Sequence, residues 1–422
     1  MAVRNRTASI AATFGRSGRM IARRRLLIGA GGLAVAGLAG RAWQQGLLGG
    51  DNPALAAWDD WASQRQAGPL KLVGAGVLAS SPHNTQPWTF AIGRFGVDIF
   101  EVPGRNLGTM DPFGRERLAG LGGAIHNMAL ASTALGRAAK VKLLPDPQNP
   151  AHVARVILGP DGSGPAAHPL LPFIARRHTH RGAWRGGPVS EAKLAAVLAF
   201  PAFAGVKVAL FAASSPLGKR FAALTDEATV AITGDAAMMA DSHRWFRHER
   251  RDAERLMDGL TLATSGVSPW LATAGAMLPA QSAADEGKYW LASTRDVHLP
   301  TASLFGLILT PGPHDRRSAL LVGSAWQRLH LNATSAGLVA QPLNQLPEMI
   351  DREAQLHAPP RFARAADALL DDSAWRPSFA FRLGLADAPA GAALRRPVSA
   401  VIGPPARMAW EVEPWKEAGG AY

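Results

Sequence analysis

Two prolines within six residues dominate the segment from Ser81 to Trp88, which reads Ser-Pro-His-Asn-Thr-Gln-Pro-Trp. Because proline fixes φ and lacks an amide hydrogen, we expect no helix here and an extended backbone. The segment also carries a hydroxyl, an imidazole, an indole and two carboxamides. Such a stiff, polar loop suits the edge of a planar heterocycle, for example the pyrimidine side of a flavin. It equally suits an ordinary proline-containing turn that enters a strand.

The composition is that of a globular protein. The chain has 422 residues, of which 47% are hydrophobic and 18% charged, enough for one large core or two domains. The net charge of +13 is concentrated at the start, where residues 1–50 hold eight arginines and no acidic residue. Residues 57–422 hold 37 basic and 31 acidic residues, without a basic face interleaved with aromatics. We therefore expect no nucleic-acid partner.

The chain contains no cysteine. Disulfides, thiolate metal sites and cysteine nucleophiles are therefore excluded, and the protein can meet an oxidising compartment without mispairing.

The N-terminal segment has the pattern of an export signal. Three arginines at 23–25 precede an uncharged apolar run at 28–39, and Ala54-Leu55-Ala56 offers a cleavage site. The paired arginines resemble a twin-arginine signal, so residues 1–56 are predicted to direct the folded protein through the twin-arginine export machinery to the periplasm. The apolar run is short for a membrane span, so no stable membrane insertion is expected after cleavage. An uncleaved N-terminal anchor is the alternative.

Hydrophobic periodicity predicts alternating helices and strands. Helices are expected at 53–66, 69–80, 117–135, 190–199, 318–336, 347–357 and 362–370. Strands are expected at 89–92, 97–102, 141–144, 153–158, 206–211 and 304–309, the first two joined as a hairpin. Residues 217–262 are helical in pattern and 269–298 have weak periodicity, so the span of about 217–298 is predicted to form a lid. The charged run from His243 to Arg255 within it is typical of a solvated helix face.

One stretch of the chain repeats. Residues 122–136 match 323–337 at an offset of 201, with identical residues at Gly122 and Gly323, Ala124 and Ala325, Leu130 and Leu331, Thr133 and Thr334, and Gly136 and Gly337. In a chain this rich in Ala, Gly and Leu, the match is a hint of internal duplication.

The segment 77–88 resembles the flavin-contacting loop of the nitroreductase family, in particular the form His-Asn-Thr-Gln-Pro-Trp of its Acg-like, FMN-binding branch. The resemblance runs from about Trp58 to Ile402. It implies an α+β, nitroreductase-like fold in which a single chain mimics the family's homodimer. The two fused halves would be residues 57–160 and 165–405, the second carrying the lid.

The resemblance also implies FMN as cofactor and a set of residues that hold it. In the loop these are Ser81, Pro82, His83, Asn84 and Gln86. The segment at 177–181 resembles the family's phosphate and ribityl motif and carries over Arg177, Thr179 and Arg181, with His180 where the branch usually has asparagine. The tail pair Arg395 and Arg396 would also meet the phosphate, and Pro342, Leu343 and Asn344, followed by Gln345, would lay backbone amides against the reactive face of the flavin.

Two other interpretations of the basic segment remain. It could be a solvated turn, or His178 and His180 could ligate a metal ion, which the neighbouring arginines disfavour. Because the first half lacks the arginine motif and residues 199–205 lack amide and hydroxyl side chains, we expect one flavin site per chain, divided between the halves.

The family resemblance implies a two-electron oxidoreductase that passes electrons to a small-molecule acceptor such as a nitroaromatic or quinone. No residue of the chain itself is needed as a catalytic nucleophile or acid–base pair, because the flavin performs the chemistry. A flavin-binding protein without enzymatic activity and an unrelated periplasmic binding protein are the alternatives.

Overall fold

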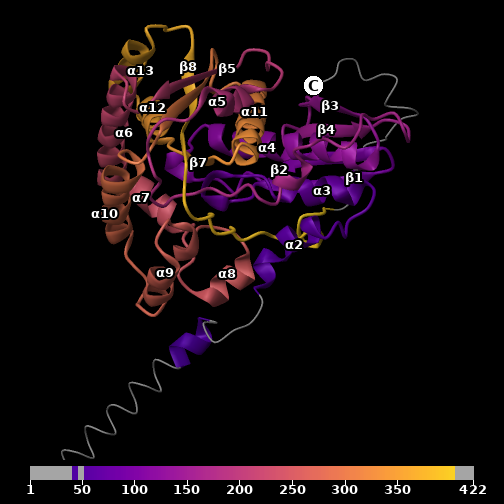
Figure 1. The fold of residues 1–422 in the computed structure, drawn as a ribbon, viewed down its shortest axis with the longest axis horizontal. Coiled ribbons are helices and arrows are strands. Elements are labelled where there is room, and N and C mark those ends of the chain that lie inside the picture. The colour runs from indigo at the N-terminus through magenta and orange to yellow at the C-terminus, as the bar shows by residue number, and fades with distance from the viewer. Residues whose placement is uncertain (1–39, 46–51, 404–422) are drawn as a thin grey trace, which may run out of the picture.

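The computed structural model describes residues 40–45 and 52–403 (Figure 1). The twin-arginine pair, Arg23 and Arg24, lies outside the described residues. Two four-stranded antiparallel sheets form the centre, with strand orders β1-β2-β4-β3 and β5-β6-β8-β7. The strands are β1 Trp88–Gly93, β2 Gly96–Glu101, β3 Ala139–Leu143, β4 His152–Leu158, β5 Lys207–Ala212, β6 Leu304–Thr310, β7 Val339–Pro342 and β8 Arg376–Gly384. The repeated strand order confirms the prediction of an α+β fold built from two halves.

Two long helices join the halves, α4 Arg115–Ala131 and α11 Arg316–Ser335. They cross where Gly122 of α4 faces Leu320, and where Gly323 of α11 faces Ala119. A β-carbon at either glycine would collide with the facing carbonyl oxygen. Adding the offset of 201 to Gly122 and Ala119 gives Gly323 and Leu320, so each contact is the counterpart of the other. This is the relation expected for a pseudo-twofold axis. The sequence repeat therefore marks the place where the halves meet.

The hydrophobic core of the first half is shared with the second. It contains Leu72 of α3 Pro69–Val77, Leu121 and Ile125 of α4, and Leu320 and Leu331 of α11, all buried. Helix α2 Ala56–Ala62 packs against α3, and α5 Glu191–Leu198 packs against α11. This shared core ties the two halves together, and two further hydrophobic clusters lie mainly in the second half.

The halves differ in their connections. Strands β1 and β2 are joined by a tight turn, whereas residues 213–303 separate β5 from β6 and contain the predicted lid. The insertion holds α6 Pro216–Gly234, α7 Ala236–His243, α8 Arg250–Leu256, α9 Pro269–Ala276 and α10 Ala283–Ser293. In Figure 1, α6 and α10 run along one side of the molecule, and α8 and α9 lie below the sheets. Between β7 and β8 come α12 Gln345–Gln355 and α13 Arg361–Leu370.

Several local predictions need correction. The helix expected at 53–66 consists of a short 3₁₀ turn and α2, which ends at Ala62, and the helix expected to reach 80 ends at Val77. Residues 269–298, which have weak periodicity, are largely helical. Strands β7 and β8 were not expected, because β7 is four residues long and ends in a proline, and β8 contains Pro377 and two arginines.

The segment after Ser81 is not extended either. Pro82–Asn84 form a single 3₁₀ turn, and φ is positive at His83, Asn84 and Gln86. Proline constrains its own φ and the residue before it, which leaves the following residues free to turn.

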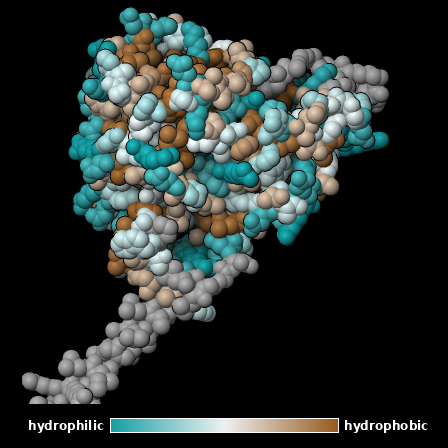
Figure 2. Space-filling model, in the orientation of Figure 1, coloured by the Kyte–Doolittle hydropathy of each residue, from teal (hydrophilic) through white to brown (hydrophobic). Residues whose placement is uncertain are grey.

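The surface of the described part has a mixed character. Figure 2 shows hydrophilic and hydrophobic residues interspersed over the face in view, with no hydrophobic band across the coloured part. No helix among the residues described is both long and apolar enough to cross a membrane.

Candidate functional site

A cavity of about 490 Å³ lies where the two halves and the insertion meet. The first half contributes loop residues Ser81, Pro82 and His83 with Glu116 and Gly120 of α4; the second contributes Thr179, Arg181, Pro342, Asn344 and Gln345. Its aromatic lining consists of Trp326, Phe379, Phe246, Tyr289 and Trp290. An apolar, aromatic cavity with a few convergent polar groups is typical of a site for a planar ligand.

The loop that begins at Ser81 holds a strained backbone at the cavity wall. Three of its residues have positive φ, 43° at His83, 56° at Asn84 and 49° at Gln86. The Ser81 hydroxyl accepts a hydrogen bond from the Gln86 amide (2.9 Å), which closes the turn. Strain of this kind persists only where surrounding contacts fix the backbone, and it is common at ligand sites.

His83 points one ring nitrogen at the insertion. Its Nε2 shares a hydrogen bond of 2.9 Å with the Ser242 hydroxyl. Burial, with the charge of Arg181 adding to it, lowers the pKa of His83 to about 4. His83 is therefore a neutral hydrogen-bonding group at the cavity wall at physiological pH.

The two predicted amide side chains do not line the cavity. Asn84 donates to the carbonyls of Gly259 (3.2 Å) and Leu394 (2.9 Å), and its Oδ1 accepts from Arg395 (2.6 Å). Gln86 donates to the Met257 carbonyl and accepts from the Arg396 amide. Both carboxamides thus fasten the loop to the insertion and to the C-terminal segment.

Two of the predicted phosphate arginines form a buried pair behind the loop. Arg177 and Arg395 are each 2% exposed; Arg177 donates to the Leu78 carbonyl and Arg395 to the Ala79 carbonyl. Neither pairs with a carboxylate among residues 40–45 and 52–403, and the Nε atom of each lacks a partner. Burial lowers the pKa of Arg177 to about 10, and burial together with Arg177 lowers that of Arg395. A guanidinium is not deprotonated in proteins at neutral pH, so two positive charges lie here without a carboxylate to balance them.

Arg181 is the predicted arginine that reaches the cavity. Its Nη1 donates to the Thr264 carbonyl of the insertion (3.0 Å), and no carboxylate of the described chain pairs with it. Burial lowers its pKa to about 10, so it stays protonated. Thr179, two residues earlier, pairs with Ala340 of β7 and also lines the cavity. The arginine segment is thereby positioned beside the end of β7.

His180 and Arg396 lie away from this cavity. His180 Nδ1 accepts from Trp184 Nε1 (2.9 Å), and its Nε2 faces the Ala388 carbonyl (3.1 Å). It lines a second cavity of about 860 Å³. Arg396 donates from Nη2 to the Ala400 carbonyl and lines neither cavity. Because both ring nitrogens of His180 have partners, the alternative of a metal ion at His178 and His180 finds no support.

The predicted segment from Pro342 enters the cavity wall at the start of α12. Pro342, Asn344 and Gln345 line the cavity, whereas Leu343 is 1% exposed in the core and its amide donates to the Ala380 carbonyl (2.7 Å). The backbone amide of Leu343 is therefore used within the sheet. The first turn of α12 contributes a helix N-terminus, which favours negative charge.

Sequence reasoning missed a buried pair of carboxyl groups at the cavity. Glu116 of α4 and Glu348 of α12 are both buried and both line the cavity. Burial raises the pKa of Glu116 to about 7 and raises that of Glu348 well above its usual value, with Glu116 adding to the shift. Both shifts favour the protonated form, so this pair binds a proton more tightly than two exposed carboxyl groups would. Their separation in sequence leaves no local signal of the contact.

Comparison with known proteins gives partial matches. No family profile matches the chain. A candidate NAD(P)H nitroreductase of Mycobacterium tuberculosis is 36% identical over 130 residues, which cover 31% of this chain and 38% of that protein. A second candidate NAD(P)H nitroreductase of the same species, named acg, is 35% identical over 82 residues, 19% of this chain and 25% of its own length.

The chain has relatives among the nitroreductases. It spans less than two fifths of the length of these curated relatives. The solved FMN-dependent nitroreductase NfnB from Mycobacterium smegmatis, in complex with NADPH, is 17% identical with a TM-score of 0.35, covering 55% of this chain and 95% of that one. A nitroreductase with bound FMN from Bacteroides fragilis is 14% identical with a TM-score of 0.32, over 55% and 94%. The two-half fold is established by this chain's own strand order and helix pair.

Proposed function

We propose that this chain is an FMN-dependent oxidoreductase of the nitroreductase type, which passes two electrons to a nitroaromatic, quinone or similar acceptor. The observation that carries the proposal is Arg181, a half-buried guanidinium that lines an aromatic cavity without a carboxylate partner in the described chain. The neighbouring Arg177 and Arg395, whose Nε atoms are unpartnered, add positive charge behind it. A phosphate dianion would balance this charge.

The chain's own residues define how the site would work. Arg181, Thr179 and the first turn of α12 would hold the phosphate and ribityl end, and Trp326 and Phe379, whose ring centroids lie 4.7 Å apart, would together form one wall against the ring. FMN supplies the two-electron chemistry when it is bound. Glu116 and Glu348, whose pKa values are raised by burial, line the cavity wall and would supply a proton to an acceptor as it is reduced. The insertion would limit the access of water, because its residues, among them Phe246, Leu271 and Tyr289, form part of the cavity lining.

Absorbance and turnover test this proposal together. The purified protein should show the visible absorbance of an oxidised flavin, and NAD(P)H should bleach it, with reoxidation by a quinone or nitroaromatic. Protein that neither contains nor takes up FMN would refute the proposal.

A protein that stores or sequesters FMN is the second candidate. It is favoured by the insertion, which supplies much of the cavity lining, including Leu271, Tyr289 and Trp290. Flavin that stays oxidised in the presence of both nicotinamide cofactors, but becomes reduced with dithionite, would favour this candidate over the enzyme.

We further propose export by the twin-arginine route, supported by the arginines and apolar run of the N-terminal sequence. Replacing Arg23 and Arg24 by lysine should leave folded, flavin-loaded precursor in the cytoplasm; normal periplasmic yield would contradict the route. The carbonyl of Ala54, within the predicted cleavage site, accepts from the Arg395 amide (2.6 Å). This contact favours a chain that keeps Ala54 after export, which mass spectrometry of the exported protein would check.

A further inference from the structure

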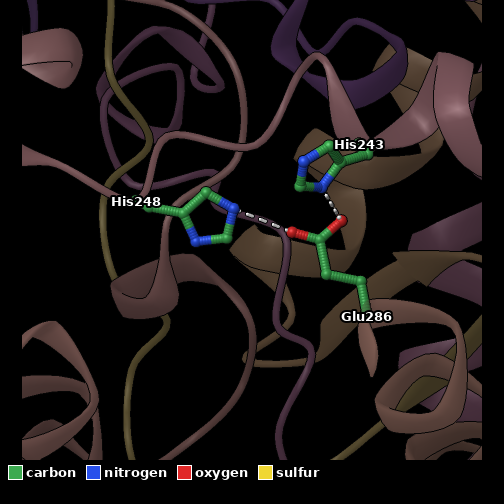
Figure 3. Close-up of side chains that lie close together, drawn as sticks. All are labelled: His243, His248 and Glu286. Carbon is green, nitrogen blue, oxygen red and sulfur yellow. Dashed lines mark hydrogen bonds and ion pairs between the residues drawn. The ribbon is translucent and has the colours of Figure 1, made fainter. Parts of the chain in front are cut away.

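Three side chains of the insertion converge on one point. His243 ends α7, His248 lies in the following loop and Glu286 belongs to α10. His243 Nδ1 is 2.9 Å from Glu286 Oε2, and His248 Nε2 is 3.0 Å from Glu286 Oε1. The potential ligand atoms all lie within 4.8 Å of one another. Figure 3 shows the two imidazoles facing different oxygens of the same carboxylate.

Hydrogen bonding explains only half of this cluster. His243 and Glu286 are in hydrogen-bond geometry, but His248 Nε2 and Glu286 Oε1 are buried atoms without a hydrogen-bond partner despite their short separation. Leaving a buried polar atom unpaired costs about 1–3 kcal/mol. A cation between the three side chains would satisfy both atoms and would take the place of the proton shared by His243 and Glu286.

The charge around the cluster permits a cation. Three arginines near the cluster are paired with carboxylates: Arg244 with Asp241 (3.3 Å), Arg247 with Asp258 (2.6 Å) and Arg250 with Glu254 (2.6 Å). At His178, by contrast, the neighbouring Arg177 and Arg395 have no carboxylate partner within the described chain. Electrostatic repulsion therefore opposes a divalent ion at His178 far more than at His243 and His248.

We propose that His243, His248 and Glu286 bind a divalent transition-metal ion. Two imidazoles and one carboxylate are a ligand set that Zn²⁺ and Fe²⁺ both accept. The ion would join the end of α7, the loop before α8 and α10, and so fasten the insertion over the site. Glu286 lines the main cavity and His248 the second one, which places the ion in the wall between them.

Calorimetric titration with Zn²⁺ tests the proposal. The full chain is treated with a chelator, dialysed and titrated; it should bind about one equivalent of Zn²⁺. Glu286→Gln keeps a side chain that can hydrogen-bond both imidazoles but removes the anionic ligand. Because even residues that only orient metal ligands change affinity by about 10–100-fold, this variant should lose at least about 100-fold in Zn²⁺ affinity.

His314→Ala is the matched control. His314 also pairs with a carboxylate, Asp351, at 2.7 Å, but belongs to no such three-residue cluster among the residues described. Its loss should leave Zn²⁺ binding unchanged. Weak, non-saturating uptake by the wild-type chain, wild-type affinity in Glu286→Gln, or an equal loss in His314→Ala would each overturn the site. The readout is independent of flavin, so it also separates this proposal from the proposed enzymatic function.

Discussion

The two halves of the molecule share a strand order but divide the work of building the site. The first half joins β1 to β2 by a tight turn, and its contributions are the strained loop from Ser81 and the α4 residues Glu116 and Gly120. The second half carries long connections, which supply Arg181, the N-terminus of α12 and the aromatic residues of the insertion. The comparison teaches that two halves with the same strand order need not contribute equally to a site. One set of cavity-lining segments can be kept, while the equivalent segments of the other half serve only to pack the fold.

The second half has an equivalent of the first-half loop, but that equivalent lacks polar side chains. Residues 199–205, between α5 and β5, occupy the place of the loop between α3 and β1 but read Ala-Phe-Pro-Ala-Phe-Ala-Gly. They contain no side chain that could hydrogen-bond to a heterocycle. Phe200 and Phe203 instead pack against the core of the second half.

The largest effect is expected at the helix crossing that relates the halves. Gly122→Ala and Gly323→Ala each place a β-carbon against a backbone carbonyl that cannot move without separating α4 from α11. Each should lower the free energy of unfolding by about 3 kcal/mol or more, measured by urea denaturation. Similar losses in the two variants would support the pseudo-twofold relation.

Gly234→Ala provides the control for these variants. Gly234 ends α6 and has open space where a β-carbon would lie, so this change should be close to neutral. A tolerated alanine at either crossing glycine, or a marked loss at Gly234, would contradict the close packing of the two halves.

The next effect concerns Arg177 and Arg181, which belong to a motif that the first half lacks. Arg181→Ala removes a charge-assisted contact to phosphate worth roughly 1.5–3 kcal/mol, and Arg177→Ala should act in the same direction. FMN should bind roughly 10- to 150-fold more weakly, while riboflavin, which lacks the phosphate, should be affected far less. Fluorescence titration measures both. Arg176→Ala, an exposed neighbour, should change neither.

Equal losses for the two flavins would show that the arginines support the fold and do not bind phosphate. In that case the division of the site between the halves would rest on the loop and the aromatic residues alone.

The sequence predicts the framework well because the framework depends on local patterns. The hairpin of β1 and β2, the helices α4 and α11 and the strand β6 follow from hydrophobic periodicity, and the glycine repeat identifies the contact between α4 and α11. Strand β8 escapes prediction because its polar residues are satisfied by distant partners. Arg382, for example, is fully buried, stacks on Trp184 and donates to the carbonyls of His298 and Gly182.

The site is predicted only in part, because its motifs are local in sequence whereas many of its contacts join residues far apart in the chain. The motifs identify Arg181 and Thr179 as cavity residues, but they cannot show that Asn84 and Gln86 turn their carboxamides toward the chain itself. The Glu116–Glu348 pair depends on contacts between residues far apart in sequence. The cluster of His243, His248 and Glu286 was concealed in a charged run typical of a solvated helix, because its third member lies on another helix.

A smaller, pH-dependent effect tests the carboxyl pair that joins α4 of the first half to α12 of the second. Because burial raises the pKa of Glu116 from 4.5 to about 7, its contribution to stability is complete below the unfolded value and is lost as pH rises through about 7. The urea midpoint should therefore fall over this range. Glu116→Gln should flatten the dependence, and exposed Glu191→Gln should not. Identical profiles for the wild type and Glu116→Gln would exclude a shared proton.

The number of flavins per chain decides whether the fused halves form one site or two. Titration of apo-protein with FMN, followed by absorbance and fluorescence, should saturate near one equivalent per chain. Arg181→Ala, from the second half, and Asn84→Ala, which releases Arg395 and the first-half loop, should both weaken that single binding event. Saturation at two equivalents, or unchanged binding in either variant, would contradict a site divided between the halves.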